Sequence, residues 1–177
     1  MAYTEPTQRA TNYLVSASVY NTDLVDNISN LNSRTAVLEG VGVHKVVLKT
    51  ADETVNNSAA LQADDELIIP VTANYTYGFK VFLVVGSSDA AADIKFGWTV
   101  PAGTTMLWHN ITSIVSADQT DDISVDLGAG IYVIELSGKI TVDSTAGNVT
   151  LTWAQNTATA ADTVIGIGSH IVYYRLA

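Results

Sequence analysis

The chain has 177 residues, of which 47% are hydrophobic and 15% are charged, and it carries 18 acidic against 8 basic side chains. This length favours one well-filled domain with an appendage, and the composition excludes an intrinsically disordered chain. A formal net charge of −10 repels phosphate groups, so neither nucleic acid nor membrane is an expected partner. The absence of cysteine excludes disulfides, thiolate nucleophiles and Cys-ligated metals.

The first segment, residues 1–11, is polar, contains Pro6 and lacks hydrophobic periodicity. This pattern predicts an extended arm that becomes ordered only against a neighbouring molecule. The segment has no basic stretch followed by an apolar one, so we expect no signal peptide and synthesis in a cytoplasm. No apolar run in the chain approaches the length of a transmembrane span.

One long helix is predicted between Ser16, a good N-cap, and Gly40, a typical helix stop. Its apolar positions recur at alternating spacings of four and three, which is typical of a narrow heptad stripe. The stripe consists of Leu24, Ile28, Leu31, Thr35 and Leu38. It packs either on the chain's own sheet or on further copies of the chain. A seam of roughly two to three heptads is too short to be stable alone, so a coiled coil would need support from the following domain.

From Val41 onward the hydrophobic period changes to two, and β-rich runs alternate with segments rich in Gly, Ser, Asn and Asp. At least eight such runs occur without intervening helices. The pattern predicts a mainly β fold, an antiparallel jelly-roll sandwich, preceded by the arm and one α-helix. The expected boundaries are 1–40 for the arm and helix and 41–177 for the β domain.

The run KVFLVV is apolar on both faces, which favours a core on one side and a partner subunit on the other. Central placement in a single sandwich is the alternative. Together with the helix stripe, this run supplies the predicted oligomerisation residues Leu24, Ile28, Leu31, Leu38, Val81, Leu83 and Val85. Large side chains with polar tips are enriched at interfaces and sugar sites. The aromatic residues considered for such contacts are Trp98, Trp108, Tyr173 and Tyr174.

No pattern in the chain indicates catalysis, and no enzyme activity and no cofactor are expected. The three histidines, His44, His109 and His170, stand apart in separate β-rich runs without a metal-ligand spacing. His44 and His170 would approach each other if the first and last strands paired. Two acidic clusters lack the spacing of a dedicated calcium loop, so we expect solvated turns and no obligatory metal site. Their carboxylates are Asp64, Asp65 and Glu66, and Asp118, Asp121 and Asp122.

The N-terminal stretch LVSASVYNTDLVDNISNL resembles the opening segment of many virion proteins of tailed bacteriophages and prophages. In those proteins a helix start rich in small residues leads into an Asn-Thr pair, then Asp-Asn and Leu. The matching positions here are Asn21, Thr22, Asp26, Asn27 and Leu31. The stretch from Lys49 to Val85, with ADIKFGWTVPAG and NVTLTWAQNT, is similar to the β domain that accompanies this segment. The matching positions there are Thr50, Ala51, Asp52, Glu53, Leu61, Asp64, Asp65, Pro70, Phe96, Trp98, Pro101, Gly103, Trp153, Gln155 and Asn156.

The resemblance implies a β domain like the trimeric jelly rolls of the tumour necrosis factor and C1q type. It also implies a structural protein on the virion surface, made in the host bacterium's cytoplasm: a homotrimeric capsid decoration (cement) or head-fibre protein anchored by its N-terminal segment. Expected partners are further copies of the chain and another virion protein, such as the major capsid or tail protein. The alternative is a tail-fibre or receptor-binding module that contacts host-surface glycans. The sequence does not separate head from tail.

Overall fold

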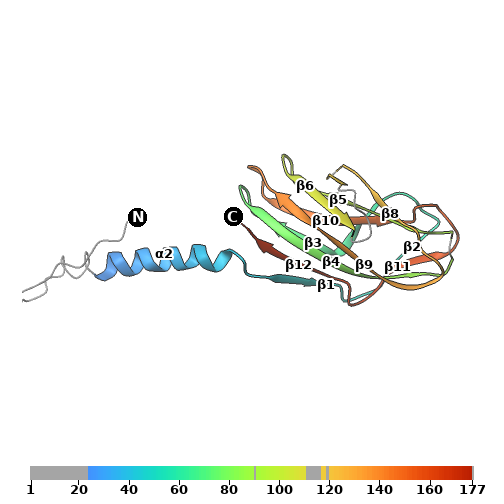
Figure 1. Cartoon of the computed structure of the whole chain (residues 1–177), viewed down its shortest axis with the longest axis horizontal. Helices are drawn as coiled ribbons and strands as arrows, with labels where there is room; N and C mark the ends of the chain where they lie inside the picture. The colour runs from blue at the N-terminus through green and yellow to red at the C-terminus, as the bar shows by residue number, and fades with distance from the viewer. Residues whose placement is uncertain (1–23, 90, 111–116, 119, 177) are drawn as a thin grey trace, which may run out of the picture. The chain divides into compact units, whose positions relative to one another are not determined.

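The structure is a computed structural model that describes residues 24–89, 91–110, 117–118 and 120–176 (Figure 1). The predicted arm, residues 1–11, and the predicted helix start at Ser16 lie outside the described residues. The chain divides into two compact units, residues 1–43 and residues 44–177. The first contains the described helix and the second contains the described strands.

The described helix, α2, spans Asp26–Gly40, and its end at Gly40 agrees with the predicted stop. Asp26 lies in the first turn, where a carboxylate is favoured by the positive end of the helix dipole. Within the predicted stripe, Leu24, Ile28 and Leu31 expose 47%, 52% and 61% of their surface. The side chain of Leu38 lies outside the described residues. The described part of the stripe is therefore on the surface of its unit.

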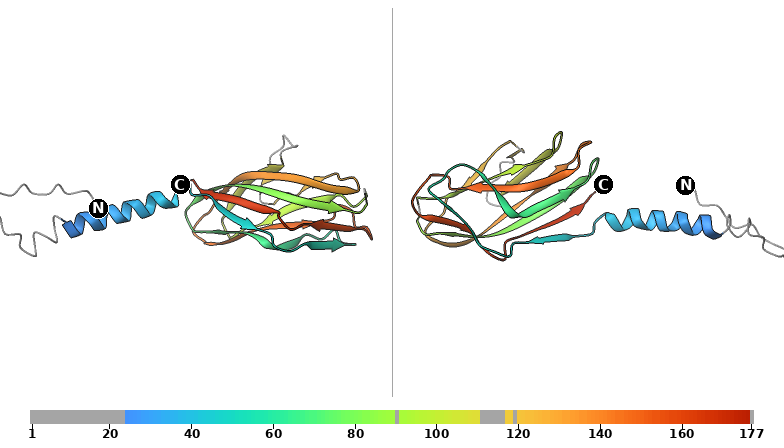
Figure 2. Two further views of the ribbon diagram at one scale, coloured as in Figure 1. Left: turned by 90° about the horizontal axis from the view of Figure 1, so that it is seen from below. Right: turned by 180° about the vertical axis from the view of Figure 1, so that it is seen from behind.

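The second unit consists of two antiparallel sheets packed face to face, as Figure 2 shows. The large sheet contains β1 (Lys45–Leu48), β2 (Glu53–Asn56), β4 (Thr76–Ser87), β6 (Thr105–Asn110), β7 (Ala117–Asp118), β9 (Gly130–Thr141), β11 (Asp162–Ile165) and β12 (His170–Arg175). The small sheet contains β3 (Gln62–Val71), β5 (Ile94–Thr99), β8 (Ile123–Val125) and β10 (Gly147–Ala154). The order is β1-β12-β4-β9-β6-β7 in the large sheet, with β11 beside β4 and β2 beside β11, and β3-β10-β5-β8 in the small one.

The strand pairing follows one rule along the whole β unit. The first strand pairs with the last, the second with the last but one, and so on inward to β6 and β7. The chain thus behaves as one long hairpin that is wrapped into two sheets, which is the topology of a jelly roll. The predicted antiparallel jelly-roll sandwich with a single described helix before it is confirmed.

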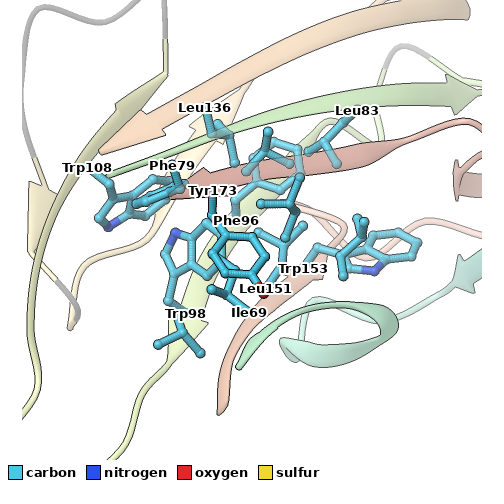
Figure 3. Close-up of a cluster of buried hydrophobic side chains, with 14 of the residues drawn as sticks. Ile69, Phe79, Leu83, Phe96, Trp98, Trp108, Leu136, Leu151, Trp153 and Tyr173 are labelled. Carbon is cyan, nitrogen blue, oxygen red and sulfur yellow. The ribbon is translucent and has the colours of Figure 1, made fainter. Parts of the chain in front are cut away.

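Alternate residues of the strands fill the space between the two sheets. Figure 3 shows this core, in which large aromatic rings from both sheets meet. The Trp98 ring packs edge-on against Phe79, with centroids 5.1 Å apart, and against Trp108 at 6.1 Å. Each large apolar side chain that is fully buried stabilises the fold by about 1.5–3 kcal/mol. The β unit therefore has a complete core of its own.

The two-faced strand β4 directs its predicted oligomerisation residues into this core. Val81, Leu83 and Val85 are each 0% exposed, whereas Phe82 and Val84 between them are partly exposed on the outer face. A side chain without exposed surface in one chain cannot contact a second copy. The assignment of Val81, Leu83 and Val85 to an interface was therefore wrong. An apolar run on both faces leaves the choice of inner face undetermined, and sheet pairing decides it.

Three of the four aromatic residues considered for external contacts also belong to the core. Trp98 is 6% exposed, Trp108 0% and Tyr173 5%, so their assignment to a ligand or interface surface was wrong. Successive side chains of a strand point to opposite faces, and Tyr174 therefore lies on the outer face, half-buried. Tyr174 alone of these four is available to a ligand.

Candidate functional site

The outer face of the large sheet carries a group of apolar side chains from β1, β4 and β9, with His170 of β12 and Glu135 of β9 among them. Val84 is paired with Val133, and the next outward position of β9 is Ile131. Leu48 and Phe82 lie on either side of His170 of β12, which is paired with both of them. Ile131 exposes 81% of its surface and Val133 exposes 70%. We call these five residues, Leu48, Phe82, Val84, Ile131 and Val133, the apolar surface. Exposed apolar patches mark interaction sites.

The opposite end of the same face holds a pocket of about 520 Å³. It is lined by side chains from the segment before β1 and from β4, β6, β9 and β12, among them His44, Lys80, His109, Ser137, Val172 and Tyr174. Lys80 is paired with Val172 on one side and Ser137 on the other. The pocket therefore crosses neighbouring strands and depends on their register.

Two glycines shape this end of the sheet. A Cβ on Gly78 would lie 2.8 Å from the Tyr174 ring, so glycine is what lets that ring lie across β4. A Cβ on Gly138 would lie 2.9 Å from the Phe79 ring and would also collide with the carbonyl of Leu107. Glycine in a strand often marks such a close approach. Gly138 itself lines the pocket, and Gly78 gives room to Tyr174, another of its lining residues.

The polar groups of the pocket are cationic or neutral. His109 Nδ1 lies 2.8 Å from the carbonyl oxygen of Asn110, and its Nε2 lies 3.2 Å from Ser137 Oγ. Because a carbonyl only accepts, this contact requires a proton on Nδ1, and Nε2 is the ring atom that faces the serine hydroxyl. The His44 ring stands 4.7 Å from the Tyr174 ring. Among the described residues, no carboxylate lines the pocket.

His44 and His170 remain apart although the first and last strands pair as expected. In the register of β1 and β12, Leu48 is opposite His170. The His170 ring stacks on Phe82, with centroids 5.0 Å apart, while His44 contacts Tyr174. The histidines therefore serve different parts of the outer face.

The first acidic cluster belongs to a buried ion cluster that joins the two sheets at one edge. Lys49, just after β1, places its Nζ atom 3.0 Å from both oxygens of Asp64 and 2.9 Å from Glu53. The side chains of Lys49 and Asp64 are 1% and 0% exposed. Asp64 also accepts from the backbone N–H groups of Glu66 and Leu67. Burial on its own lowers the pKa of Lys49, but hydrogen bonds and charge from Glu53 and Asp64 outweigh burial and raise it.

Three further carboxylates of the two acidic clusters, those of Glu66, Asp118 and Asp121, accept hydrogen bonds from backbone N–H groups. Glu66 accepts from the hydroxyl and N–H of Thr50, which lowers the pKa of Glu66. Asp118 accepts from the hydroxyl and N–H of Thr120, which lowers its pKa, and Asp121 accepts from the Asp118 N–H. Within the described ranges, no three His, Asp or Glu side chains are placed to hold a metal ion.

Chelation with EDTA is therefore expected to leave the stability of the protein unchanged. The carboxylates of Asp64, Asp118 and Asp121 are occupied by lysine or backbone partners, and Asp65 and Asp122 are exposed. The melting midpoint should move by less than about 5 °C, which corresponds to roughly 1–2 kcal/mol. Differential scanning calorimetry with and without EDTA measures this. A larger drop that added calcium reverses would reveal a structural metal.

No protein-family model matches the chain. No curated protein matches it either. Among solved structures, it is similar to the tripod from the baseplate of bacteriophage Tuc2009, with 12% identity, a TM-score of 0.33, and coverage of 97% of this chain and 98% of that one. It is also similar to infectious bursal disease virus Gx strain, with 10% identity, a TM-score of 0.28, and coverage of 76% of this chain and 36% of that one. At these identities and TM-scores, neither likeness bears on function.

The described part of the chain contains no helix that is both long enough and apolar enough to span a membrane. On the outer face, the pocket and the apolar surface are the two features considered below as binding surfaces.

Proposed function

We propose that this chain is a structural protein of a bacteriophage virion surface, a homotrimeric capsid decoration or head-fibre protein anchored by its N-terminal segment. The observation that carries the proposal is the apolar surface on an otherwise strongly acidic chain. In a protein with a net charge of −10, solubility comes from charge, so an exposed apolar patch indicates contact with another protein.

The apolar surface supports self-association because it lies on regular, paired strands. Val84 and Val133 are held opposite each other in the register of β4 and β9. Little ordering entropy is then lost when a second copy covers these side chains. The resemblance of the β domain to trimeric jelly rolls is the reason for proposing three copies in the oligomer.

The helix unit offers a second apolar surface. Leu24, Ile28 and Leu31 are exposed along the described part of α2. A helix of 15 residues with so narrow a stripe gains its stability from contacts beyond itself. Those contacts are either copies of the same helix or the virion protein that anchors it. The resemblance of the opening segment to phage and prophage virion proteins supports the anchoring role of residues 1–40.

Sedimentation equilibrium of the full-length protein tests the trimer. At micromolar concentration we expect three times the mass of one chain. Ile131→Glu places a charge in the apolar surface and should shift the equilibrium towards monomer by at least about tenfold in the association constant, or roughly 1.4 kcal/mol. Thr99→Glu, which adds the same charge to an exposed strand position of the small sheet, is the matched control and should remain trimeric. A monomeric wild-type protein would refute the trimer.

A further inference from the structure

The pocket on the outer face has the size of a small-molecule site. Such sites measure roughly 300–1,000 Å³, and this one measures about 520 Å³. It also has their usual composition, with the apolar side chain of Val172 and the Tyr174 ring beside a few polar groups. The pocket lies wholly within the β unit, which has its own core.

The charge of the pocket is opposite to that of the chain. Lys80 lines it, no carboxylate among the described residues does, and the chain as a whole has a net charge of −10. The Lys80 side chain is exposed, and within the described ranges no hydrogen bond or ion pair joins its ammonium group to another side chain. Lys139, opposite Gly78 on β9, adds a second ammonium group on the same face. A lysine ammonium group that forms no ion pair among the described residues, beside the hydroxyl groups of Ser137 and Tyr174, favours an anionic ligand.

The Tyr174 and Ser137 side chains of the pocket suit the uncharged part of a sugar ligand. The Tyr174 ring offers an apolar surface for the C–H groups of a pyranose, and its hydroxyl and that of Ser137 can bond to sugar hydroxyls. The Tyr174 ring is restricted in its position by contact with Gly78 beneath it and with His44 beside it. A ring that is fixed before binding loses little conformational entropy when a ligand packs on it.

The pocket and the apolar surface are compatible with simultaneous use. Lys80 and Val84 point to the same face of β4 and are four positions apart, a separation of about 13 Å along a strand. A second copy centred on Val84, Ile131 and Val133 leaves Lys80 and Tyr174 accessible when its edge lies at Phe82, two positions from Lys80 on the same face. We propose that this pocket binds an acidic saccharide, a sugar unit that bears a carboxylate or a phosphate, with Lys80 at the anion and Tyr174 against the ring.

Isothermal titration calorimetry on the full-length protein tests the proposal with three probes: glucuronate, glucose 6-phosphate and neutral glucose. We expect saturable binding of at least one anionic probe and binding of glucose at least about tenfold weaker. The comparison of glucuronate with glucose 6-phosphate identifies which anion the pocket prefers. Binding should weaken as salt is raised, because the Lys80 ammonium is exposed to screening.

Lys80→Gln should weaken binding of the preferred anionic probe by at least about tenfold. Lys95→Gln, which removes the same charge from β5 of the small sheet, is the matched control and should stay within about twofold. Equal binding of glucose, no saturation by either anion, or an equal loss in both variants would overturn the proposal. So would a Lys80→Gln protein that binds sugar normally but no longer forms the oligomer, because the pocket would then hold an acidic side chain of another copy. The sedimentation result for the wild-type protein decides the trimer independently of these outcomes.

Discussion

Replacement of Lys49 by Met is expected to lower the free energy of unfolding by about 3–5 kcal/mol. The substitution keeps most of the apolar stem and removes only the cation. Asp64 would then remain buried, at 0% side-chain exposure, without the ammonium group that contacts both of its oxygens. An uncompensated buried carboxylate is among the costliest defects that one substitution can produce. Urea denaturation at pH 7, followed by circular dichroism, measures the change.

Two further variants distinguish the contribution of the ion cluster to stability from the general effect of losing a lysine. Lys95→Met removes a lysine from a partly exposed strand position and should cost less than about 0.5 kcal/mol. Lys49→Met combined with Asp64→Asn should recover part of the loss, since asparagine still accepts from the N–H groups of Glu66 and Leu67. A loss below about 1 kcal/mol in the single variant would contradict the assigned role of the cluster.

The same cluster predicts how the loss depends on pH. Because the folded state raises the pKa of Lys49 above its ordinary value of 10.5, the folded chain keeps this proton to a higher pH than the unfolded chain does. The stabilisation is therefore complete below pH 10.5 and is lost as the pH rises through the folded-state pKa. The difference between wild type and Lys49→Met should accordingly be constant from neutral pH to about pH 9 and should narrow in more alkaline solution.

A chain that begins at Val41 is expected to fold but to lose attachment to the virion. The unit from His44 onward holds all the described strands and the buried core. The deletion removes an apolar stripe whose described members, Leu24, Ile28 and Leu31, would stabilise an assembly by roughly 1.5–3 kcal/mol each when fully buried. The truncated protein should therefore retain the circular dichroism spectrum of a β protein. It should fail to bind phage particles that lack the protein, whereas the full-length chain should rebind them.

Two outcomes of this experiment would change the proposed function. If the truncated chain unfolds, the helix contributes to the core of the β unit and the anchoring role loses its support. If it folds and still binds the depleted particles, the contact surface lies on the β unit instead. Cosedimentation of purified protein with particles measures the binding directly.

Local pattern was sufficient to predict the architecture of the β unit. Alternating apolar and polar residues produce strands with one buried face wherever they occur, so the sandwich follows from periodicity. The stop at Gly40 likewise depends on one residue. Both features are determined by residues close together in the chain, which is why they could be read before the structure.

The orientation of particular side chains could not be predicted in the same way. Val81 and Phe82 are both apolar, and only the pairing of β4 with β9 and β12 determines that Val81 is buried and Phe82 faces outward. Trp98 and Trp108 carry polar N–H groups that suggested a surface, yet their rings meet in the core. Aromatic composition alone does not distinguish an interface from an interior.

The pocket was missed because its residues converge from separate strands. Lys80, Ser137 and Tyr174 come from β4, β9 and β12, and their proximity follows from register. One signal was present in the sequence: Gly78 and Gly138 interrupt β-rich runs, and glycine in a strand often marks a close approach of other groups. The two glycines indicate where the pocket lies along the strands, but they do not identify the residues that line it.

The pairing of the first described strand with the last, and of the second with the last but one, also affects when the protein can fold. During synthesis β1 leaves the ribosome before the other described strands, and its partner β12 leaves after them. The segment between these two strands must therefore be closed into a loop before β1 gains its hydrogen bonds to β12, which makes folding slow. Until then β4, which lies between β9 and β12, has one open edge that can pair with a neighbouring nascent chain. When many copies are made from one messenger, prompt synthesis of β12 would limit such pairing between neighbouring nascent chains.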